Sequence, residues 1–390
     1  MRHKFFGVID IIRLLCYTEV AFLLRSLGQS ALKIYKKEDI TMKKLLALVL
    51  VALLVLTGAA MAEGKVGVAM PTQDLQRWNQ DGANMKAQLE AAGYEVILTY
   101  SNNDVAKQVS DIENMILNEV DALVVASIDG SALGTVLASA KEEGIPVIAY
   151  DRLLTDTDAV DYYATFDNYM VGTIQGTFIK EKFDLDNVTE PLTMEVFAGS
   201  PDDNNALYFY QGAWDVLSPY VEKGTLVVKS GQTDFQTCAI LGWGTDDAQA
   251  RMDNLLTAHY SDGVAPDIVL SPNDSLALGV VNSLQAAGFT LEEFPVITGQ
   301  DCDVTNTKNI IKGYQAMSVF KDTRTLATKV VEMVDAILSG AEVPVNDTET
   351  YDNGVKVVPS YLCEPVFADV NNYQELLVDS GYYTAEQLAD

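Results

Sequence analysis

The amino-acid sequence predicts an α/β fold of two similar lobes, each an open, doubly wound parallel sheet. Two observations lead to this prediction. From Lys65 onward, short apolar runs alternate with segments whose apolar residues follow the 3.6-residue period of a helix. A segment at 120–134 also recurs at 266–279, so one βαβ plan is used twice. Because the strands are apolar throughout, we expect helices to cover both faces of each sheet.

The predicted elements follow one another as strand and helix along most of the chain. Strands are expected at 65–69, 95–99, 121–126, 145–150, 192–198, 225–229, 267–271 and 295–298. Helices are expected near 80–92, 104–118, 130–143, 168–182, 204–221, 245–259, 273–287 and 322–339. Four of these helices are followed by a glycine in the position that a left-handed C-terminal cap favours: Gly93, Gly144, Gly288 and Gly340.

The internal repeat has consequences for where a ligand binds. "VDALVVASIDGSALG" and "PDIVLSPNDSLALG" both end in D-x-x-A-L-G, at Asp129 and Asp274, and each is followed by a helix and a further strand, "PVIAYD" or "PVITGQD". The duplication favours two lobes over one eight-stranded barrel. In open α/β sheets ligands bind outside the carboxyl ends of the strands. Two facing lobes would therefore line one cleft with residues that follow strands.

The N-terminal region predicts export. Residues 42–62 hold Met42-Lys43-Lys44, the apolar run "LLALVLVALLVLTG" and the A-x-A site that ends at Ala62, which together are typical of a cleavable signal peptide. The run is too short for a membrane span, and no cysteine stands near the site to carry a lipid anchor. We interpret 1–41 as a mis-assigned extension, with a genuine extra segment as the alternative. The expected location is periplasmic or otherwise extracytoplasmic.

Charge and cysteine content narrow the function classes. The net charge of −29 excludes nucleic acid as a partner, because a nucleic-acid binder needs a basic stripe. The exported part holds Cys238, Cys302 and Cys363 without C-x-x-C spacing, so we expect free, buried thiols and at most one bridge. The chain has no nucleophile elbow, phosphate loop, zinc or dinucleotide motif, and His259 is the single histidine after the signal peptide. No cofactor or metal is therefore expected.

Polar and aromatic residues cluster instead after the predicted strands. Taken singly, each has a structural explanation: Asp129, Asp203 and Asp274 could be helix N-caps, and Trp243 could be core. Taken together, carboxylate, amide, cationic and tryptophan side chains suit a neutral ligand rich in hydroxyls, because they combine charge-assisted hydrogen bonds with a flat apolar face. The candidate ligand-binding residues are Arg77, Trp78, Asp129, Asp151, Arg152, Asn205, Trp243, Asn273, Asp301 and Lys321.

At these residues the chain resembles the type I periplasmic binding proteins, the receptors of sugar ABC importers. The resemblance covers nearly all of 65–389 and is most specific at "ASIDG", "VIAYDR", "YYATFDN", "GSPDDNNA", "AQARMDNLL", "VFKDTR", "NGVKVVPSYL" and "VDSGYY". It is similar in particular to multiple-sugar (aldose) receptors of plant-associated bacteria, and more distantly to xylose-binding and galactose/glucose-binding receptors. The loop "TDFQTCAILGW" departs from these relatives, which leaves the preferred sugar open.

The resemblance implies a role for every candidate except Asp129. Trp78 and Trp243 would sandwich a pyranose ring, and Arg77 would come from the loop after the first strand. Asp151 and Arg152 would hold hydroxyls, with Arg152 oriented by the neighbouring carboxylate. The remaining contacts would come from Asn205, Asn273, Asp301 and Lys321.

The resemblance also implies a three-stranded hinge, with crossings near Asp167, Lys321 and Val358. The N-terminal lobe would then comprise 63–167 and 322–357, and the C-terminal lobe 168–321 and 358–390. The expected partners are a monosaccharide and an ABC importer permease, with a membrane chemoreceptor or sensor kinase as a further candidate, and the protein is expected to be a monomer.

Three alternatives to a nutrient-sugar receptor follow from the same residues. Paired carboxylates such as Asp129 and Asp151 could hydrolyse glycosides, although glycosidases commonly use barrels. A receptor for a furanose or a quorum signal would use a similar cleft. A transcription-regulator core of this fold is disfavoured, because no DNA-binding helices precede Lys65 and a signal peptide is predicted.

Overall fold

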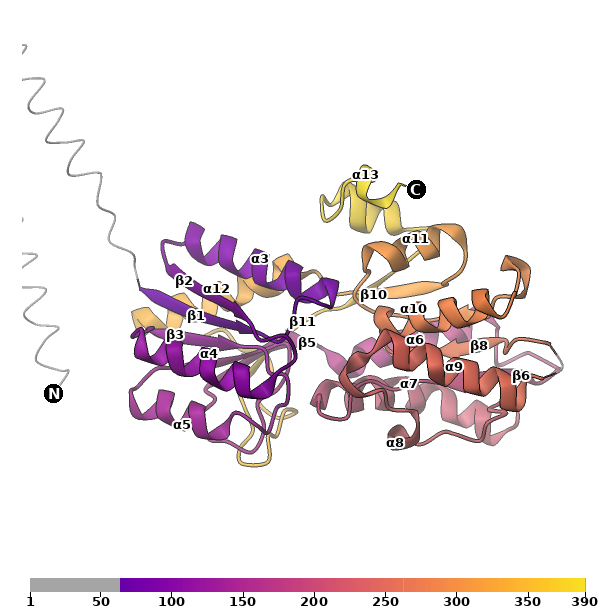
Figure 1. The fold of residues 1–390 in the computed structure, drawn as a ribbon, viewed down its shortest axis with the longest axis horizontal. Helices are drawn as coiled ribbons and strands as arrows, with labels where there is room; N and C mark the ends of the chain where they lie inside the picture. Colours follow the sequence, from indigo (N-terminus) through magenta and orange to yellow (C-terminus); the bar gives the residue numbers. More distant parts are fainter. Residues whose placement is uncertain (1–63, 262, 390) are drawn as a thin grey trace, which may run out of the picture. The chain divides into compact units, whose positions relative to one another are not determined.

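The computed structural model describes residues 64–261 and 263–389, and residues 62–390 form one compact unit. The predicted signal peptide and the segment before it lie outside the described residues. The compact unit contains two α/β lobes (Figure 1), which confirms the predicted fold class.

The N-terminal lobe is built on a six-stranded sheet in the order β11-β5-β4-β3-β1-β2, in which every pair of neighbours is parallel. The apolar strands inside the sheet are buried on both sides, as parallel sheets require, whereas the edge strand β2 is only partly buried. The strands are β1 (Lys65–Met70), β2 (Glu95–Tyr100), β3 (Ala122–Val125), β4 (Val147–Tyr150), β5 (Tyr162–Phe166) and β11 (Ser360–Cys363).

Helices cover both faces of this sheet. On one face α4 (Val105–Leu117) and α5 (Gly134–Glu142) pack Ile112 and Leu137 against Leu123. On the other face α3 (Gln76–Ala91) and α12 (Thr323–Ser339) pack Met85 and Val330 against the opposite side of the strands. Both faces are therefore core, and polar side chains of this lobe collect at the ends of the strands.

The C-terminal lobe repeats the plan with a four-stranded parallel sheet, ordered β7-β6-β8-β9, which is continued by the antiparallel pair of β10 and β12. The bridge between Gln300 and Val319 joins the two parts. The strands are β6 (Leu192–Val196), β7 (Leu226–Val227), β8 (Ile268–Leu270), β9 (Val296–Ile297), β10 (Met317–Phe320) and β12 (Val366–Asp369). The helices are α6 (Asn168–Lys182), α7 (Asn204–Glu222), α8 (Phe235–Cys238), α9 (Thr245–His259), α10 (Asp274–Ala286), α11 (Val304–Lys312) and α13 (Ala385–Leu388).

The chain passes between the lobes at three places. It leaves the N-terminal sheet after β5 and enters α6, and it returns after β10 into α12, close to the expected Asp167 and Lys321. The third crossing expected near Val358 is wrong, because β11 pairs with β5 in the N-terminal sheet and β12 pairs with β10. β11 is therefore the edge strand of the N-terminal sheet. The third crossing between the lobes lies after it, between Cys363 and Val366.

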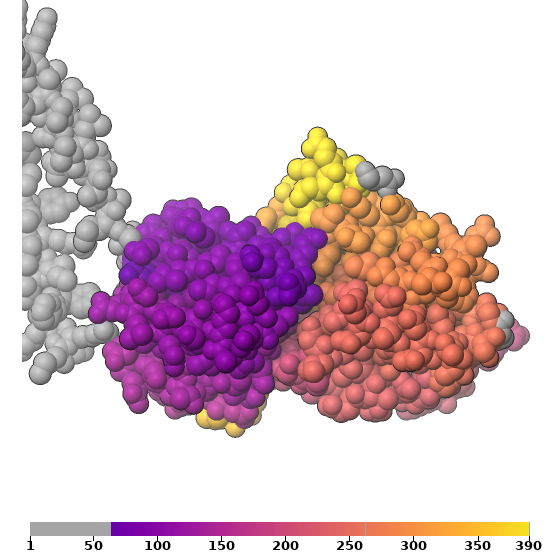
Figure 2. Space-filling view, viewed as in Figure 1, coloured from indigo at the N-terminus to yellow at the C-terminus, as the bar shows by residue number. Residues whose placement is uncertain are grey.

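All eight predicted strands are present, most of them shorter than expected. Sequence patterns missed the strands at β5, β10, β11 and β12, which mix aromatic or polar residues with apolar ones and lie at sheet edges or near the crossings. The surfaces of the two lobes meet on the face drawn in Figure 2. Side chains also bridge them, as Gln76 of α3 donates to the Tyr383 hydroxyl at 3.0 Å. The structure is thus a closed form.

Candidate functional site

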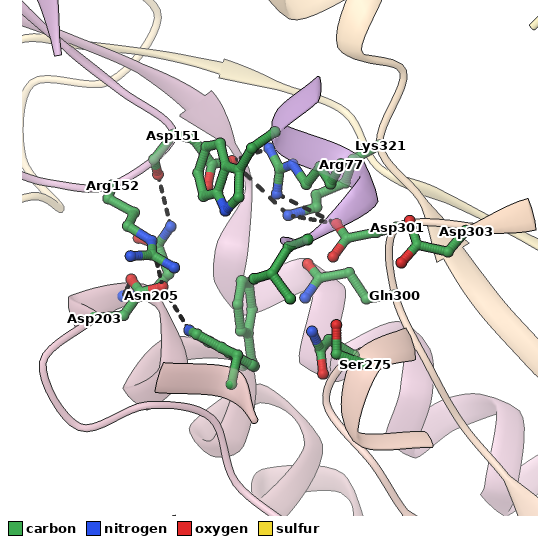
Figure 3. A pocket seen from close by; sticks show the side chains of 15 residues that line it. Arg77, Asp151, Arg152, Asp203, Asn205, Ser275, Gln300, Asp301, Asp303 and Lys321 are labelled. Carbon is green, nitrogen blue, oxygen red and sulfur yellow. Dashed lines mark hydrogen bonds and ion pairs between the residues drawn. The ribbon is translucent and has the colours of Figure 1, made fainter. Parts of the chain in front are cut away.

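A cavity lies between the two lobes, where strands of both sheets end. Eleven of the fifteen residues that line it are polar or charged, and the other four are one leucine and three aromatic residues (Figure 3). The residues that line it are Leu75, Arg77, Trp78, Asp151, Arg152, Asp203, Asn205, Phe209, Trp243, Asn273, Ser275, Gln300, Asp301, Asp303 and Lys321.

The structure brings nine of the ten candidate residues into this one cavity, and Asp129 is the exception. Its carboxylate accepts hydrogen bonds from the backbone amide and the hydroxyl of Ser131, both at 2.8 Å, and so closes the turn before α5. The predicted ligand contact of Asp129 is therefore wrong, and its turn-forming role is the correct one. The suggested catalytic pair of Asp129 and Asp151 is also not formed at this cavity.

Arg77 is the centre of an ion network that spans both lobes. It sits in the first turn of α3, which begins at Gln76 and not near residue 80, so Arg77 is held by a helix and not by a loop. Its guanidinium bonds to Asp81 at 3.0 Å, to Asp301 at 3.3 Å and to the Asp151 carboxylate. Asp151 follows β4 of the N-terminal sheet, and Asp301 belongs to the C-terminal lobe. By pairing with both carboxylates, Arg77 connects the two lobes.

Asp151 is a buried carboxylate whose charge is stabilised by cations. Lys321, which follows β10, lies 3.8 Å from Asp151 and 3.2 Å from Asp301. Burial alone would raise the pKa of Asp151, but the charges of Arg77 and Lys321 outweigh it, so the pKa lies below its usual value. Asp151 is therefore an ionised hydrogen-bond acceptor at neutral pH.

Arg152 pairs with the opposite lobe and not with its neighbour in sequence. Its Nε lies 3.0 Å from the Asp203 carboxylate, and its Nη1 donates to the Ser127 carbonyl at 3.0 Å. The expectation that Asp151 orients Arg152 is thus wrong, because adjacent side chains at a strand end diverge.

Asp203 is a site residue that the sequence patterns missed, because it is also the N-cap of α7. One of its carboxylate oxygens accepts a hydrogen bond from the backbone N–H of Asn205. The other oxygen faces Arg152 and accepts a hydrogen bond from the Trp243 indole.

Asn205 crosses the cleft to the backbone of the N-terminal lobe (Figure 3). Its side-chain nitrogen donates to the Asp151 carbonyl at 2.6 Å, and its side-chain oxygen accepts from the Asn168 side chain at 3.1 Å. The same carbonyl accepts from Tyr163 at 2.6 Å and from Thr165 at 2.9 Å. Asp151 has a φ of 59°, a left-handed conformation that non-glycine residues seldom adopt. These three donors hold it there when the lobes are closed.

The two tryptophans line the cavity from opposite lobes. Trp78 lies beside the guanidinium groups of Arg77 and Arg152, whose carbons are 5.2 Å and 5.1 Å from the ring centre. Trp243 packs directly on Gly199, where an added Cβ would lie 2.0 Å from the ring, so only glycine leaves room for this ring. With 3% and 4% of their surfaces exposed, both rings are positioned by packing before a ligand arrives.

A second group of carboxyls lies on the wall of the C-terminal lobe. Asp274 is buried beneath the cavity, where it accepts from Gln315 and Ser318 at 2.9 Å and from the Asp303 amide at 2.8 Å. It is therefore not the N-cap of α10, a role that Asn273 fills by accepting from the Leu276 amide. The pKa of Asp303 is raised to about 7, mainly by burial and to a lesser extent by the negative charge of Asp301. Asp303 was missed because its strand, β9, ends six residues earlier.

Metal and thiol chemistry are not indicated at this site. Within 64–261 and 263–389, no group of His, Cys, Asp and Glu side chains is arranged to hold a metal ion. Cys238, Cys302 and Cys363 are buried, and burial raises the pKa of Cys238 and Cys363 to about 11. The site can therefore bind through fixed donors, acceptors and ring faces, and its tightly paired charges favour recognition of a neutral polar molecule.

Comparisons with known proteins agree with this geometry. The periplasmic binding protein domain model matches residues 66–342. The chain is 49% identical over 340 residues to the multiple sugar-binding periplasmic receptor ChvE of Rhizobium radiobacter, covering 87% of this chain and 96% of the receptor. It is 35% identical over 347 residues to the D-xylose-binding periplasmic protein of Escherichia coli, covering 89% and 99%.

A solved structure is similar over the whole of its chain. An ABC transporter solute-binding protein from Clostridium phytofermentans, with bound β-D-glucose, is 62% identical, covers 83% of this chain and 100% of its own, and superposes with a TM-score of 0.81. The protein therefore belongs to the periplasmic binding protein family, among its type I sugar-binding receptors.

Proposed function

We propose that this protein captures a monosaccharide, an aldopyranose such as glucose, galactose, arabinose or xylose, in the cavity between its lobes and delivers it to an ABC sugar importer. The observation that carries the proposal is the meeting of nine of the ten candidate residues, two of them tryptophans, in one cavity between the lobes. Rings from both lobes flank paired carboxylates and cations, which suits the apolar face and the hydroxyl rim of a sugar.

Ligand binding and lobe closure are expected to be coupled. The contacts of Arg77 with Asp301 and of Asn205 with Asp151 exist only when the lobes are together. A sugar that touches both walls would favour that form, because it adds contacts that the open form lacks. The closed form would then dock on the importer permease as a monomer, and a membrane chemoreceptor or sensor kinase is a second candidate partner.

We place the protein outside the cytoplasm, as a cleavable signal peptide at 42–62 without a lipid anchor would direct. Helices long and apolar enough to span a bilayer are not found in the part of the chain that the structure describes. Mass spectrometry of the exported protein tests this placement: we expect its N-terminus at Glu63, and an uncleaved or lipid-modified N-terminus would contradict it.

A thermal-shift panel of pentoses and hexoses tests the proposed ligand class. We expect the unfolding temperature to rise with one or more aldopyranoses, because a ligand that binds only the folded state stabilises it by mass action. Furanosides and acyl signals should have no effect. A panel in which only one of those raises the unfolding temperature would favour a receptor for a furanose or a quorum signal.

Catalysis is not part of the proposal, because the curated relatives are binding proteins and the pair of Asp129 and Asp151 is not assembled. Incubation with xylo- and gluco-oligosaccharides should release no new reducing ends. Enzymatic release, with loss of activity on changing Asp151, would favour a hydrolase.

A further inference from the structure

The wall of the cavity on the C-terminal lobe carries hydrogen-bond acceptors that no protein group satisfies. Gln300 is 2% exposed, and its side-chain oxygen is buried without a hydrogen-bond partner among the described residues. One carboxyl oxygen of Asp303 is in the same state. Both residues line the cavity together with Ser275 (Figure 3). Leaving such groups unpaired is costly, so this wall is suited to a donor supplied by a ligand.

The orientation of the Gln300 amide is fixed by its other end. Its nitrogen donates to the Pro272 carbonyl at 3.1 Å, and Pro272 also accepts from Gln175 at 3.0 Å. A flipped amide would set the two carbonyl oxygens against each other, so the free oxygen must point away from Pro272. Gln300 is therefore an acceptor for an O–H or N–H group in the cavity.

The other side of the cavity already has enough polar groups for the ring hydroxyls. Arg77, Asp151, Arg152 and Lys321 supply paired donors and acceptors there, and the two tryptophans supply ring faces. A pentopyranose has only ring hydroxyls, whereas a hexopyranose adds one exocyclic hydroxymethyl group. Leu75 and Phe209 line the same cavity and offer apolar contact for the carbon of that group.

Resting on the proposed function, we infer that Gln300, together with Ser275 and Asp303, binds the exocyclic hydroxymethyl group of an aldohexose, so that this wall selects hexoses over pentoses. A site built to accept a hydrogen bond from a hydroxyl discriminates strongly against an analogue that lacks it, because its own polar groups are then left buried and unpaired.

Calorimetry with three matched sugars tests this inference. D-Glucose carries the hydroxymethyl group, 6-deoxy-D-glucose replaces it with a methyl group, and D-xylose lacks it. Wild-type protein should bind glucose about tenfold or more tighter than either analogue. Gln300→Met keeps the side-chain length but removes the acceptor, and it should weaken glucose binding about tenfold while xylose binding changes less than about twofold.

A matched control separates recognition from packing. Gln175→Met also removes a buried glutamine amide that bonds to Pro272, but residue 175 does not line the cavity. It should change glucose and xylose affinity by the same factor, and Ser275→Ala should lower glucose affinity selectively. Equal losses for both sugars in Gln300→Met would overturn the inference while sugar binding itself stands. Wild-type protein that binds no monosaccharide would overturn the proposed function and the inference together.

Discussion

The two walls of the cavity differ in how their polar groups are paired. On the N-terminal lobe, Arg77 and Asp151 form an ion pair with each other, and Arg152 pairs with Asp203 of the opposite lobe although its Nε has no hydrogen-bond partner. On the C-terminal lobe, Gln300 and Asp303 each keep a buried oxygen without a hydrogen-bond partner. The charges of the first wall are thus neutralised within the protein, whereas the second wall keeps acceptors for a ligand. A receptor built in this way has a fixed half that sets the ring and an unfilled half that sets the choice of sugar.

The largest expected effect concerns the wall on the N-terminal lobe. Asp151→Ala removes the counterion that Arg77 and Lys321 share, and it should lower sugar affinity at least about 100-fold in calorimetry. Removing one partner of a buried ion pair also costs roughly 3–5 kcal/mol of stability, so circular dichroism must show that the variant stays folded.

Asp151→Asn, which keeps the shape, and Asp129→Ala, which lies outside the cavity, complete this test. We expect Asp151→Asn to lose most of the affinity and Asp129→Ala to bind as the wild type does. Near-normal affinity in both Asp151 variants would mean that this wall only stabilises the fold.

The next effect concerns the ring face of the C-terminal lobe. Gly199→Ala places a Cβ against the Trp243 ring and so pushes the ring toward the cavity that it lines. Overpacking of this kind costs roughly 1–3 kcal/mol, so sugar affinity should fall about tenfold or more. Tryptophan fluorescence should show a changed environment, and Gly134→Ala, where an added Cβ meets only the Asp156 carbonyl at 4.0 Å, is the control for an added methyl group. Unchanged affinity would show that Trp243 does not contact the ligand.

A smaller effect is expected at the contact that joins the walls. Asn205→Ala removes the hydrogen bond that the side-chain nitrogen donates to the Asp151 carbonyl across the cleft, and so it weakens the closed form. Affinity should fall about tenfold. If Asn205 acts through closure, small-angle scattering at saturating sugar should show a larger open fraction than in the wild type. A full return to the closed form at saturation would instead indicate a direct ligand contact only.

The smallest effect is a pH dependence of stability on the unfilled wall. Asp303 has a pKa of about 7 in the folded protein, raised by burial and by Asp301, and about 4 when unfolded. Between these values the unfolded state has released a proton that the folded state retains, so stability falls as pH rises from about 4 through 7. Asp303→Asn removes this dependence. We compare the unfolding temperatures of the variant and the wild type at each pH. The variant should gain a few °C relative to the wild type between about pH 5 and 8. A difference that stays constant with pH would contradict the raised pKa of Asp303.

Sequence patterns located the site but could not separate residues that share a motif. Asp151 follows β4 directly and so lies at the carboxyl end of that strand, beside the cavity. Asp129 comes four residues after β3 ends and does not line the cavity. Both have the same residue type and the same kind of predicted position. The distinction depends on where each strand stops, which apolar runs mark only to within a few residues.

The residues that were missed show a second limit. Asp203 was explained as a helix cap and is one, yet its other oxygen faces the cavity, because a carboxylate can serve two partners at once. Gln300 carries no charge, and within "PVITGQD" the repeat draws attention to the neighbouring Asp301 instead. Its importance appears only when the burial of its oxygen and the direction of its amide are known.

Calorimetric titration of the exported chain with D-glucose measures sugar binding itself, without reference to a transporter. We expect one site with a dissociation constant of about 1 μM, equivalent to roughly −8 kcal/mol. The absence of heat with glucose, galactose, arabinose and xylose alike, from protein shown to be folded, would contradict it.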